Sequence, residues 1–409
     1  MSIKKSVVIA SLGTLIEYYD YSIFSMFLPF LAPTFFAAAS EYDALIMGFY
    51  AILIASVARP LGGVIFGAIG DRFGRRAALL SSLYGIAIAT LIIGILPGHQ
   101  VIGVYAAIII IVIRSIQMIC YGGEYSGAGV YVVELAQGKN ESLLGAILSA
   151  MALVGSVVAS LVGMGLTMLS PNAPQWRVAF ILGGLLGLLA IYLRKDMSES
   201  VSKSELGQSE SLWSIFKLYP REIFAGICIG GFITVPFSTV LGFINPVLKT
   251  QHVLTGFGFM SLQFVLSITA VVILIASGYL ADKITPSKVM RLSSLALVVL
   301  AIPLGFMIQS MVLWVVIVAE IVLVIINEFL FGPSNAYLKQ LFPANCRYRG
   351  VAFSFCVGMS LFGGLTPLVE NWLYQYSGSF VMISCWLIFV GGLTYLSIKL
   401  VDRRIISNS

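Results

Sequence analysis

Charged residues are scarce in this sequence: Asp, Glu, Lys and Arg make up only 10% of its 409 residues, against about 25% in a typical soluble domain. Hydrophobic residues make up 59%, and the mean hydropathy is +0.99. So few polar side chains cannot cover a water-facing globule, which excludes an ordinary cytosolic or secreted enzyme. The composition therefore predicts an integral membrane protein.

Histidine is nearly absent and cysteine is rare, which removes several kinds of site. The two histidines, His99 and His252, fall in predicted outer loops, so we expect no histidine proton relay. The five cysteines follow neither a metal-ligand nor a disulfide spacing. No G-x-x-x-x-G-K-[ST] phosphate loop occurs, which argues against an ATP-driven pump. The sequence thus predicts a protein that is not an enzyme and has no metal and no cofactor.

Long apolar runs, in contrast, are abundant. A membrane-spanning helix needs roughly 20 mostly apolar residues. The first run follows two lysines as in a signal peptide, but Glu17 and Asp20 interrupt it and no cleavage site follows, so we expect a retained first helix. The predicted helices cover 6–36, 43–69, 77–97, 101–134, 143–169, 177–194, 220–248, 257–281, 287–309, 312–338, 349–375 and 379–400.

The basic residues are distributed unevenly between the two sides that these helices define. With both termini inside, 20 of the 24 Lys and Arg residues, Arg194 among them, fall in cytoplasmic segments. Arg177 and Lys249 fall on the other side, and Arg59 and Arg114 fall within helices. This asymmetry follows the positive-inside rule and predicts twelve helices with cytoplasmic termini. The net charge of +6 then reflects topology and not nucleic-acid binding.

A polar stretch rich in Ser and Glu divides the chain into two sets of six helices. We expect an N-terminal bundle over 1–195, a central cytoplasmic loop over 196–219 and a C-terminal bundle over 220–409. The halves echo each other, because the pattern G-x-x-x-D-[RK] ends the second helix at Arg72 and the eighth at Lys283. Paired halves of this kind indicate parallel repeats around a central site at the membrane midplane.

A short charged loop between the second and third helices is typical of a gate. Residues 59–76 read RPLGGVIFGAIGDRFGRR and place four charges at the inner surface. Asp71 can face the positive end of another helix while it pairs with an arginine. Such a latch would hold one conformation, whereas the alternative is that the arginines only set helix orientation. The predicted cytoplasmic gate comprises Gly67, Asp71, Arg72, Gly74, Arg75, Arg76 and, in the second half, Asp282.

This loop and three further segments resemble the major facilitator superfamily and, within it, the metabolite:proton symporters of proline/betaine, α-ketoglutarate, citrate and shikimate. The segments are GTLIEYYDY (13–21), RSIQMICYGGEYSGAGVYVVELA (114–136) and QWRVAFILGGLLGLLAIYLRKDMSES (175–200), and FPANCRYRGVAFSF (342–355) matches less closely. Met118 stands where this branch usually has glycine. The sequence ends nine residues after Leu400, so we expect no coiled-coil extension of the kind that osmosensing members carry.

The resemblance implies an all-α membrane protein with twelve transmembrane helices in two pseudo-symmetric six-helix bundles, the major facilitator fold. It also implies a secondary transporter that works by alternating access, without ATP, in the bacterial cell inner membrane. We expect a multi-pass protein that functions as a monomer in the lipid bilayer, with a small-molecule substrate and a proton as partners.

Charged and polar residues within the predicted helices are the candidate binding residues, because a charge at mid-bilayer costs at least about 2.5–3.5 kcal/mol. Glu17 and Asp20 lie one turn apart on the first helix. We expect Arg114 to pair with one of these two carboxylates, so that protonation of the carboxylate frees the arginine. The alternative is a salt-bridge network that only joins helices. A stripe of base, amide, phenol and acid follows one face of the fourth helix: Arg114, Gln117, Tyr121 and Glu124.

The second half offers fewer candidates. Glu320 lies in the middle of the tenth helix, and Asn327 lies seven residues further on, nearly on the same face. Glu320 is interpreted either as a site residue or as a protonated, hydrogen-bonded packing residue. Arg59, near the inner end of the second helix, is interpreted as a structural interface residue.

The balance of charges within the helices bears on the substrate. Carboxylates outnumber arginines there, and a dicarboxylate carrier should offer more than one arginine. A zwitterion or ammonium group fits better, with Tyr21 and neighbouring tyrosines available for cation–π contacts. The sequence therefore predicts proton-coupled uptake of a small polar metabolite, most of all a zwitterion such as proline or betaine. The alternatives are an organic acid:proton symporter, proton-coupled efflux of cationic amphiphiles and a membrane receptor that does not transport.

Overall fold

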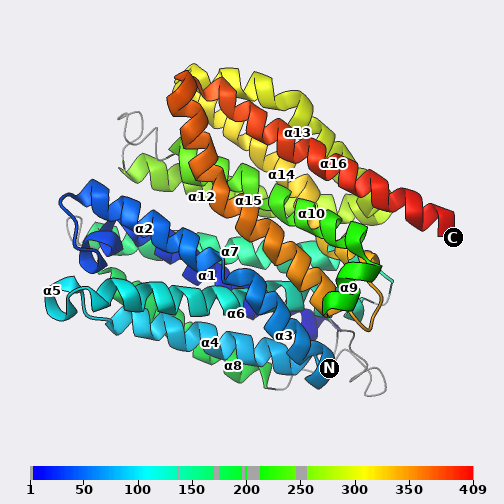
Figure 1. Cartoon of the computed structure of the whole chain (residues 1–409), viewed down its shortest axis with the longest axis horizontal. Helices are drawn as coiled ribbons and strands as arrows, with labels where there is room; N and C mark the ends of the chain where they lie inside the picture. The colour runs from blue at the N-terminus through cyan, green and yellow to red at the C-terminus, as the bar shows by residue number, and fades with distance from the viewer. Residues whose placement is uncertain are drawn as a thin grey trace.

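Long helices run side by side along the longest axis of the molecule (Figure 1). The structure is a computed structural model that describes residues 3–136, 138–169, 175–195, 199, 212–245 and 256–408. Its helices are α1 (Ile3–Phe35), α2 (Glu41–Ser56), α3 (Arg59–Phe73), α4 (Arg75–Ile95), α5 (His99–Ile102), α6 (Tyr105–Leu135), α7 (Glu141–Leu169), α8 (Trp176–Arg194), α9 (Leu212–Leu218), α10 (Pro220–Ser238), the π-helix η1 (Thr239–Ile244), α12 (Gly256–Lys283), α13 (Pro286–Gln309), α14 (Leu313–Leu341), α15 (Arg347–Ser377), the 3₁₀-helix η2 (Phe380–Met382) and α16 (Ile383–Asn408).

Eleven segments of the described chain are long and apolar enough to cross a membrane, with α2 and α3 counted as one span over Ile46–Phe73. The helix α1 is not among these eleven, and it carries Glu17 and Asp20 near its middle. It coincides with the first of the twelve predicted segments, and the other eleven predictions also fall on helices. The all-helical fold with 11 or 12 spans is therefore as predicted. Of the predicted central loop 196–219, only Glu199 and 212–219 are described, and Lys249 and His252 also lie outside the described residues.

Three predicted helices are interrupted in the structure. The prediction 43–69 divides at Val57–Ala58, because Pro60 has no N–H to donate to the carbonyl of Ser56. The prediction 220–248 changes to the π-helix η1 a few residues after Pro236. The prediction 101–134 begins later, at Tyr105, because Gly103 adopts a positive φ of 60° between α5 and α6.

The helices form two groups, α1–α8 and α10–α16. Within the first, α1 packs on α7, and α4 packs on α6 and α8; within the second, α10 packs on α15, and α13 packs on α14 and α16. The groups meet where α3 lies against α15 and where α7 lies against α12 (Figure 1). One end of the molecule holds both chain ends, α9 and the α3–α4 turn at Gly74, and α5 lies at the opposite end. We call the first the basic end, because Arg72, Arg75 and Arg76 stand at that turn.

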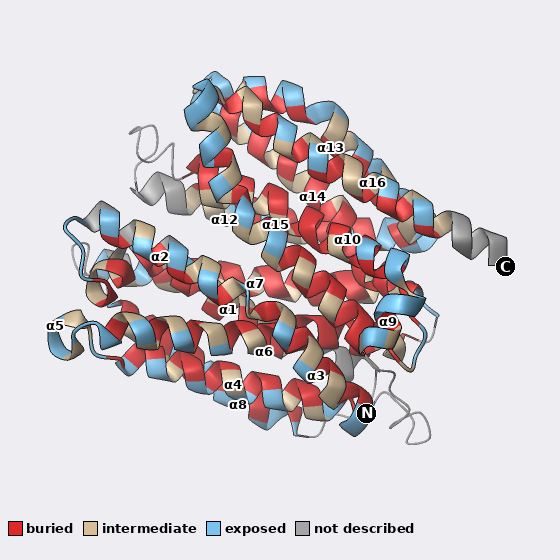
Figure 2. Ribbon diagram, in the orientation of Figure 1, coloured by how far each residue is buried: buried red, intermediate tan, exposed pale blue. Residues whose placement is uncertain are grey.

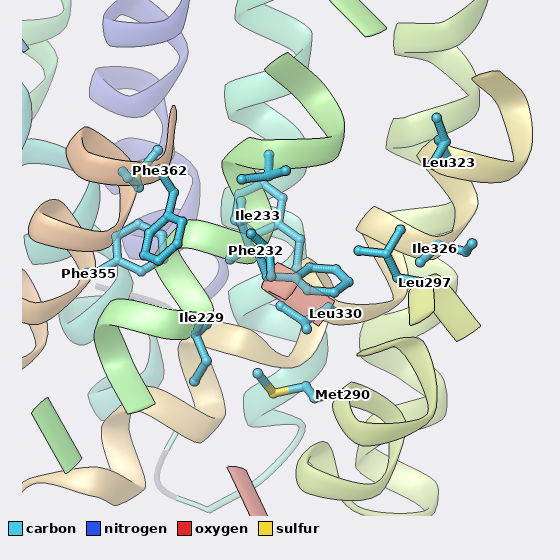
Figure 3. Packing of buried hydrophobic residues seen from close by; sticks show 14 of the residues in the cluster. Ile229, Phe232, Ile233, Met290, Leu297, Leu323, Ile326, Leu330, Phe355 and Phe362 are labelled. Atoms are coloured by element: carbon cyan, nitrogen blue, oxygen red, sulfur yellow. The ribbon is translucent and has the colours of Figure 1, made fainter. Parts of the chain in front are cut away.

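The outer faces of the helices are apolar as well as the interior. Figure 2 shows exposed residues along the outside of both groups and buried residues between the helices. Exposed side chains on these faces include Ile88, Leu185, Val272 and Phe306, each at least 51% exposed. In a membrane, lipid would cover these apolar side chains. The core of the second group joins α10, α13, α14 and α15 through aliphatic and aromatic side chains (Figure 3).

Candidate functional site

A buried polar cluster joins the middle of α1 to α6 and α4. The carboxylate of Asp20 lies 3.3 Å from the guanidinium of Arg114. It also accepts hydrogen bonds from Thr90 (2.8 Å), from Gln117 (2.8 Å) and from the hydroxyl of Tyr121. All five side chains are at most 1% exposed. Of the two carboxylates that the sequence offered Arg114, the structure places Asp20 beside it.

The donors around Asp20 determine what this cluster can do. Four donor groups converge on the two carboxylate oxygens, an arrangement that satisfies an ionised carboxylate. The same nitrogen of Arg114 that contacts Asp20 also donates to the side-chain oxygen of Gln117 at 2.7 Å, and the guanidinium carbon lies 3.9 Å from the ring centroid of Phe24. A proton on Asp20 would remove the charge that attracts Arg114 and leave the guanidinium available to another anion.

Glu17, one turn before Asp20, pairs with a different arginine. Its carboxylate lies 2.9 Å from the guanidinium of Arg59, at the first residue of α3. Both side chains are buried, and the Arg59 guanidinium lies 6.0 Å from the ring centroid of Tyr121. Arg59 therefore forms a buried ion pair at the break between α2 and α3.

Glu124 ends the predicted stripe on α6, but it belongs to a second cluster. Its carboxylate lies 2.6 Å from the guanidinium of Arg194 and accepts a hydrogen bond from Ser82 at 2.9 Å. Arg194 and Glu124 are completely buried, and a Cβ atom at Gly13 would overlap both of them. The sequence predicts Arg194 to fall in a cytoplasmic segment and does not indicate its burial; the structure buries it at the end of α8, against Glu124.

Arg194 also binds backbone atoms of two other helices. Its guanidinium donates to the carbonyl oxygens of Ile9 (3.2 Å) and Ala10 on α1 and of Leu79 (3.3 Å) on α4. One side chain thus joins α8, α6, α4 and α1. No signal in the sequence separates it from the arginines that set helix orientation, because it ends an apolar run as they do.

Three carboxylates within the helices of the second group, those of Glu320, Glu328 and Glu370, are buried without an ion-pair partner among the described residues. Glu320 is 0% exposed, and neither of its oxygens has a hydrogen-bond partner in the described structure. The side-chain amide of Asn327 donates to Glu328 at 3.0 Å. Glu370 accepts a hydrogen bond from Thr239 at 2.5 Å.

A small cavity lies between the two groups. Its lining comes from α7, from α10 and η1, and from α12 and α14, and its volume is about 30 Å³. The polar lining residues are Gln263, Ser267, Asn327 and Glu328. The structure therefore brings Asn327 to a cavity, whereas Glu320, two turns earlier on α14, is not among its lining residues. Tyr21 is half-buried and packs beside the apolar cluster around Tyr121.

The predicted gate residue Asp71 lies at the basic end, between the two groups. Its carboxylate lies 2.5 Å from Arg75 and 3.8 Å from Arg349, near the start of α15. The backbone of Gly67 approaches the same residue, because a Cβ atom at Gly67 would lie 3.0 Å from Cα of Arg349. The guanidinium of Arg75 lies 5.1 Å from the ring centroid of Tyr348. These contacts join α3 and α4 to α15.

Further contacts at the basic end join the same two groups. Arg347 lies 3.2 Å from Glu134, and Lys339 lies 2.5 Å from Glu141. Asp282 accepts hydrogen bonds from the first backbone N–H groups of α7, those of Ser142 and Leu143, at 2.9 Å each. We call the ion pairs and caps of Asp71, Glu134, Glu141 and Asp282 the basic-end latch.

The remaining gate residues do not bridge the groups in the contacts that the structure gives them. Arg72 is exposed and stacks on Phe73 of its own turn. Gly74 has a φ of 99°, which a glycine adopts without strain. The backbone N–H groups of Arg75 and Arg76 donate to the carboxylate of Glu199 at 2.8 and 3.2 Å. This part of the loop is therefore tied to Glu199, in the predicted connection 196–219.

Two groups of membrane-length helices, buried ion pairs and a latch between the groups define a secondary transporter. The model of the Major Facilitator Superfamily matches residues 10–367, so the chain belongs to this family. It is a multi-pass integral membrane protein of a transporter family and not an enzyme. The predicted membership is confirmed.

Two relatives cover most of the chain. It is 30% identical over 397 residues to the "Putative proline/betaine transporter" of Staphylococcus aureus (strain COL), across 92% of this chain and 83% of the relative. It is 27% identical over 411 residues to the "Proline/betaine transporter" of Escherichia coli (strain K12), across 95% and 81%.

Solved structures share the fold at lower identity. The proton:xylose symporter XylE bound to 6-bromo-6-deoxy-D-glucose superposes with a TM-score of 0.76 at 19% identity, over 96% of this chain and 94% of that one. The human organic anion transporter MFSD10 superposes with a TM-score of 0.75 at 14% identity, over 97% and 100%. At these identities the likeness shows the fold alone.

Proposed function

We propose that this protein is a proton-coupled symporter that takes up a small zwitterion, such as proline or betaine, by alternating access. The basic end is cytoplasmic in this proposal, because the Lys and Arg residues of the loops gather there. The two bundles are 1–195 and 220–409, joined by a cytoplasmic connection over 196–219. The names of the relatives support the substrate, and the buried pairs of the first group support the coupling.

The Asp20–Arg114 pair is the observation that carries the proposal. When Asp20 is ionised, it holds Arg114 at 3.3 Å. A substrate carboxylate that takes Arg114 leaves Asp20 without its positive partner and so favours its protonated form. By linkage, a proton on Asp20 favours binding of the substrate carboxylate by the same factor. Proton and substrate then bind together, which is the requirement for symport.

The charge balance of the second group supports a substrate that also carries a positive charge. The arginines Arg59, Arg114 and Arg194 each have one carboxylate partner in the first group. Glu320, Glu328 and Glu370 have no ion-pair partner among the described residues. A substrate with one carboxylate and one cationic nitrogen fits this arrangement, because its carboxylate would bind the released guanidinium of Arg114 and its nitrogen would meet the acidic excess of the second group. A dicarboxylate fits less well, since only one guanidinium is released.

The basic-end latch supports alternating access. Its contacts close the cytoplasmic side by joining α3, α4, α6 and α7 to α12, α14 and α15. Opening toward the cytoplasm requires these contacts to separate. The gate residues that join the groups are then Asp71, Arg75 and Asp282, with Arg349 as a partner that the sequence analysis did not single out.

Weakening the latch is expected to expose Cys356. This thiol is completely buried between the groups, where its Sγ lies 3.4 Å from the carbonyl oxygen of Gly122. In a variant with Cys356 as the sole cysteine, Asp71→Asn should raise the rate of N-ethylmaleimide modification about fivefold or more, since a loss of about 1 kcal/mol shifts a two-state equilibrium by that factor. Mass spectrometry of the labelled protein measures the rate.

The matched control is Asp43→Asn, because Asp43 is an exposed carboxylate on α2, away from the basic end. It should leave the labelling rate unchanged. Equal labelling of the Asp71→Asn protein and its parent would show that Asp71 does not hold the closed state.

Uptake into proteoliposomes tests the proposed function directly. An imposed gradient, acid outside, should drive accumulation of proline or betaine, and collapse of the gradient with a protonophore should abolish it. Competition with α-ketoglutarate, citrate and shikimate separates the zwitterion from the organic acids. Asp20→Asn should remove the dependence on the gradient. Glu124→Gln tests the one carboxylate of the α6 stripe, which pairs with Arg194 in the second cluster.

Four outcomes would contradict the proposal. Accumulation of an organic acid alone would replace the zwitterion as substrate. Resistance to cationic dyes without metabolite uptake would indicate efflux, and saturable binding with no flux would indicate a receptor. Unchanged proton dependence in both variants would refute the role of these carboxylates.

A further inference from the structure

The cavity between α7, η1, α12 and α14 presents oxygen atoms without donor partners. Of the polar atoms on its lining residues, Gln263 Oε1, Asn327 Oδ1 and Glu328 Oε2 are buried and have no hydrogen-bond partner in the described structure. Asn327 and Glu328 are only 4% and 2% exposed. Three acceptors, one of them on a carboxyl group, therefore line one cavity.

The side chains of α14 that line the cavity are oriented toward it. The amide nitrogen of Asn327 is used in its bond to Glu328, which leaves its carbonyl oxygen as the free group. On α14, Val324, Asn327 and Glu328 are three and four residues apart and share the face toward the cavity. Leu323, Ile326 and Leu330 of the same helix belong to the apolar core instead (Figure 3).

The acceptors have no counter-charge in the part of the chain that the structure describes. Glu328 forms no ion pair among the described residues, and the lining contains no Lys, Arg or His. An ionised carboxylate that is buried without a partner costs much more than one hydrogen bond returns. A cation in the cavity would supply the missing charge and would bind all three oxygens.

The size of the cavity restricts the cation. A volume of about 30 Å³ holds about one or two water-sized particles. It is too small for a proline ring or a trimethylammonium group. Oxygen ligands with a single carboxyl group suit a hard cation of low charge, and a divalent ion would leave a larger excess of charge.

The helix beside the cavity is irregular. Val240 and Leu241 of the π-helix η1 line it, together with Pro236 of α10. Turns of π-helix are rare and are frequent at functional sites. In transporters, interrupted helices commonly supply backbone carbonyl oxygens to coupling ions. Such carbonyls would complete the coordination that three side chains begin.

We propose that this cavity binds a small monovalent cation, with Na⁺ as the probe, through Gln263, Asn327 and Glu328. Its position between the groups would make occupancy sensitive to their separation, and a role as a second coupling ion rests on the proposed transport function. Binding itself does not rest on that function, so it is tested without transport.

Thermal unfolding of the purified full chain, followed by tryptophan fluorescence, tests the site. NaCl is titrated against choline chloride at constant ionic strength. The midpoint should rise saturably with Na⁺, because a ligand that binds only the folded state stabilises it. Glu328→Gln should raise the half-saturating Na⁺ concentration about tenfold or more, and Gln263→Ala should have the same effect. Because Gln263 is less buried than Glu328, the second variant still tests the site if the first folds poorly. Asp43→Asn, which alters an exposed carboxylate of α2 outside the cavity, should respond as the parent does.

The outcomes separate the site from the proposed function. The same shift in NaCl and choline chloride, or an unchanged Na⁺ response in both cavity variants, would overturn the proposal. A shift with proline or ammonium chloride but not with NaCl would assign the oxygens to the ammonium group of the substrate and overturn it too. Saturable Na⁺ binding that both cavity variants weaken supports the site even if the proteoliposomes accumulate no metabolite.

Discussion

Arg114→Ala is expected to abolish uptake and to reduce the free energy of unfolding by about 3–5 kcal/mol. The variant leaves Asp20 buried and ionised without its positive partner, and it removes the guanidinium proposed to bind the substrate carboxylate. Arg114→Lys keeps the charge but loses the planar donor fork, so it should retain most of the free energy of unfolding while it loses most of the uptake. Proteoliposome uptake and chemical denaturation of the purified protein measure the two effects.

A second substitution distinguishes the two contributions. Asp20→Asn in the Arg114→Ala background should recover part of the stability, because the unpaired charge is gone, while uptake stays at background. Lys288→Ala removes an exposed basic residue of α13 and should change neither quantity. Normal uptake by Arg114→Ala would exclude this residue from substrate binding.

Arg194→Ala is expected to have the largest effect on stability among the arginines. It leaves Glu124 as an unpaired buried carboxylate, at a cost of about 3–5 kcal/mol, and removes donors from carbonyl oxygens of Ile9 and Leu79. The measurement is denaturant unfolding in detergent, with folded yield as a second readout.

The matched control lies on the same helix. Arg177, at the other end of α8, is half-buried and donates to the carbonyl oxygens of Gly94 and Leu96. Arg177→Ala removes a guanidinium without stranding a carboxylate and should cost far less. Replacing Arg194 and Glu124 together by Met and Gln should restore most of the loss. Equal effects of Arg194→Ala and Arg177→Ala would contradict the ion-pair explanation.

The sequence predicts the α6 stripe well because helical periodicity alone places Arg114, Gln117 and Tyr121 on one face. Periodicity does not say which residues of other helices meet that face. Asp20 and Glu17 were equivalent candidates, one turn apart, and only the packing of α1 separates their partners. Glu124 shares the stripe and still belongs to another cluster, because α8 brings Arg194 to it.

The cavity and the break between α2 and α3 were harder to predict from the sequence. The polar lining of the cavity comes from two helices, α12 and α14, which the sequence does not show to be neighbours. That its oxygens lack hydrogen-bond donors becomes apparent only from the packed structure. The break at Val57–Ala58 did have a signal in Pro60, but a proline near the middle of a membrane span does not always interrupt it.

The bonds of Arg194 have a consequence for biosynthesis. Its partner Ile9 lies 185 residues earlier in the chain, so α1, α4 and α6 must enter the membrane well before α8 is made. During that interval Glu124 lacks its cation, although the Asp20–Arg114 and Glu17–Arg59 pairs need no residue of α8. The contacts that Arg194 makes with α1, α4 and α6 can therefore form only after α8 has been synthesised.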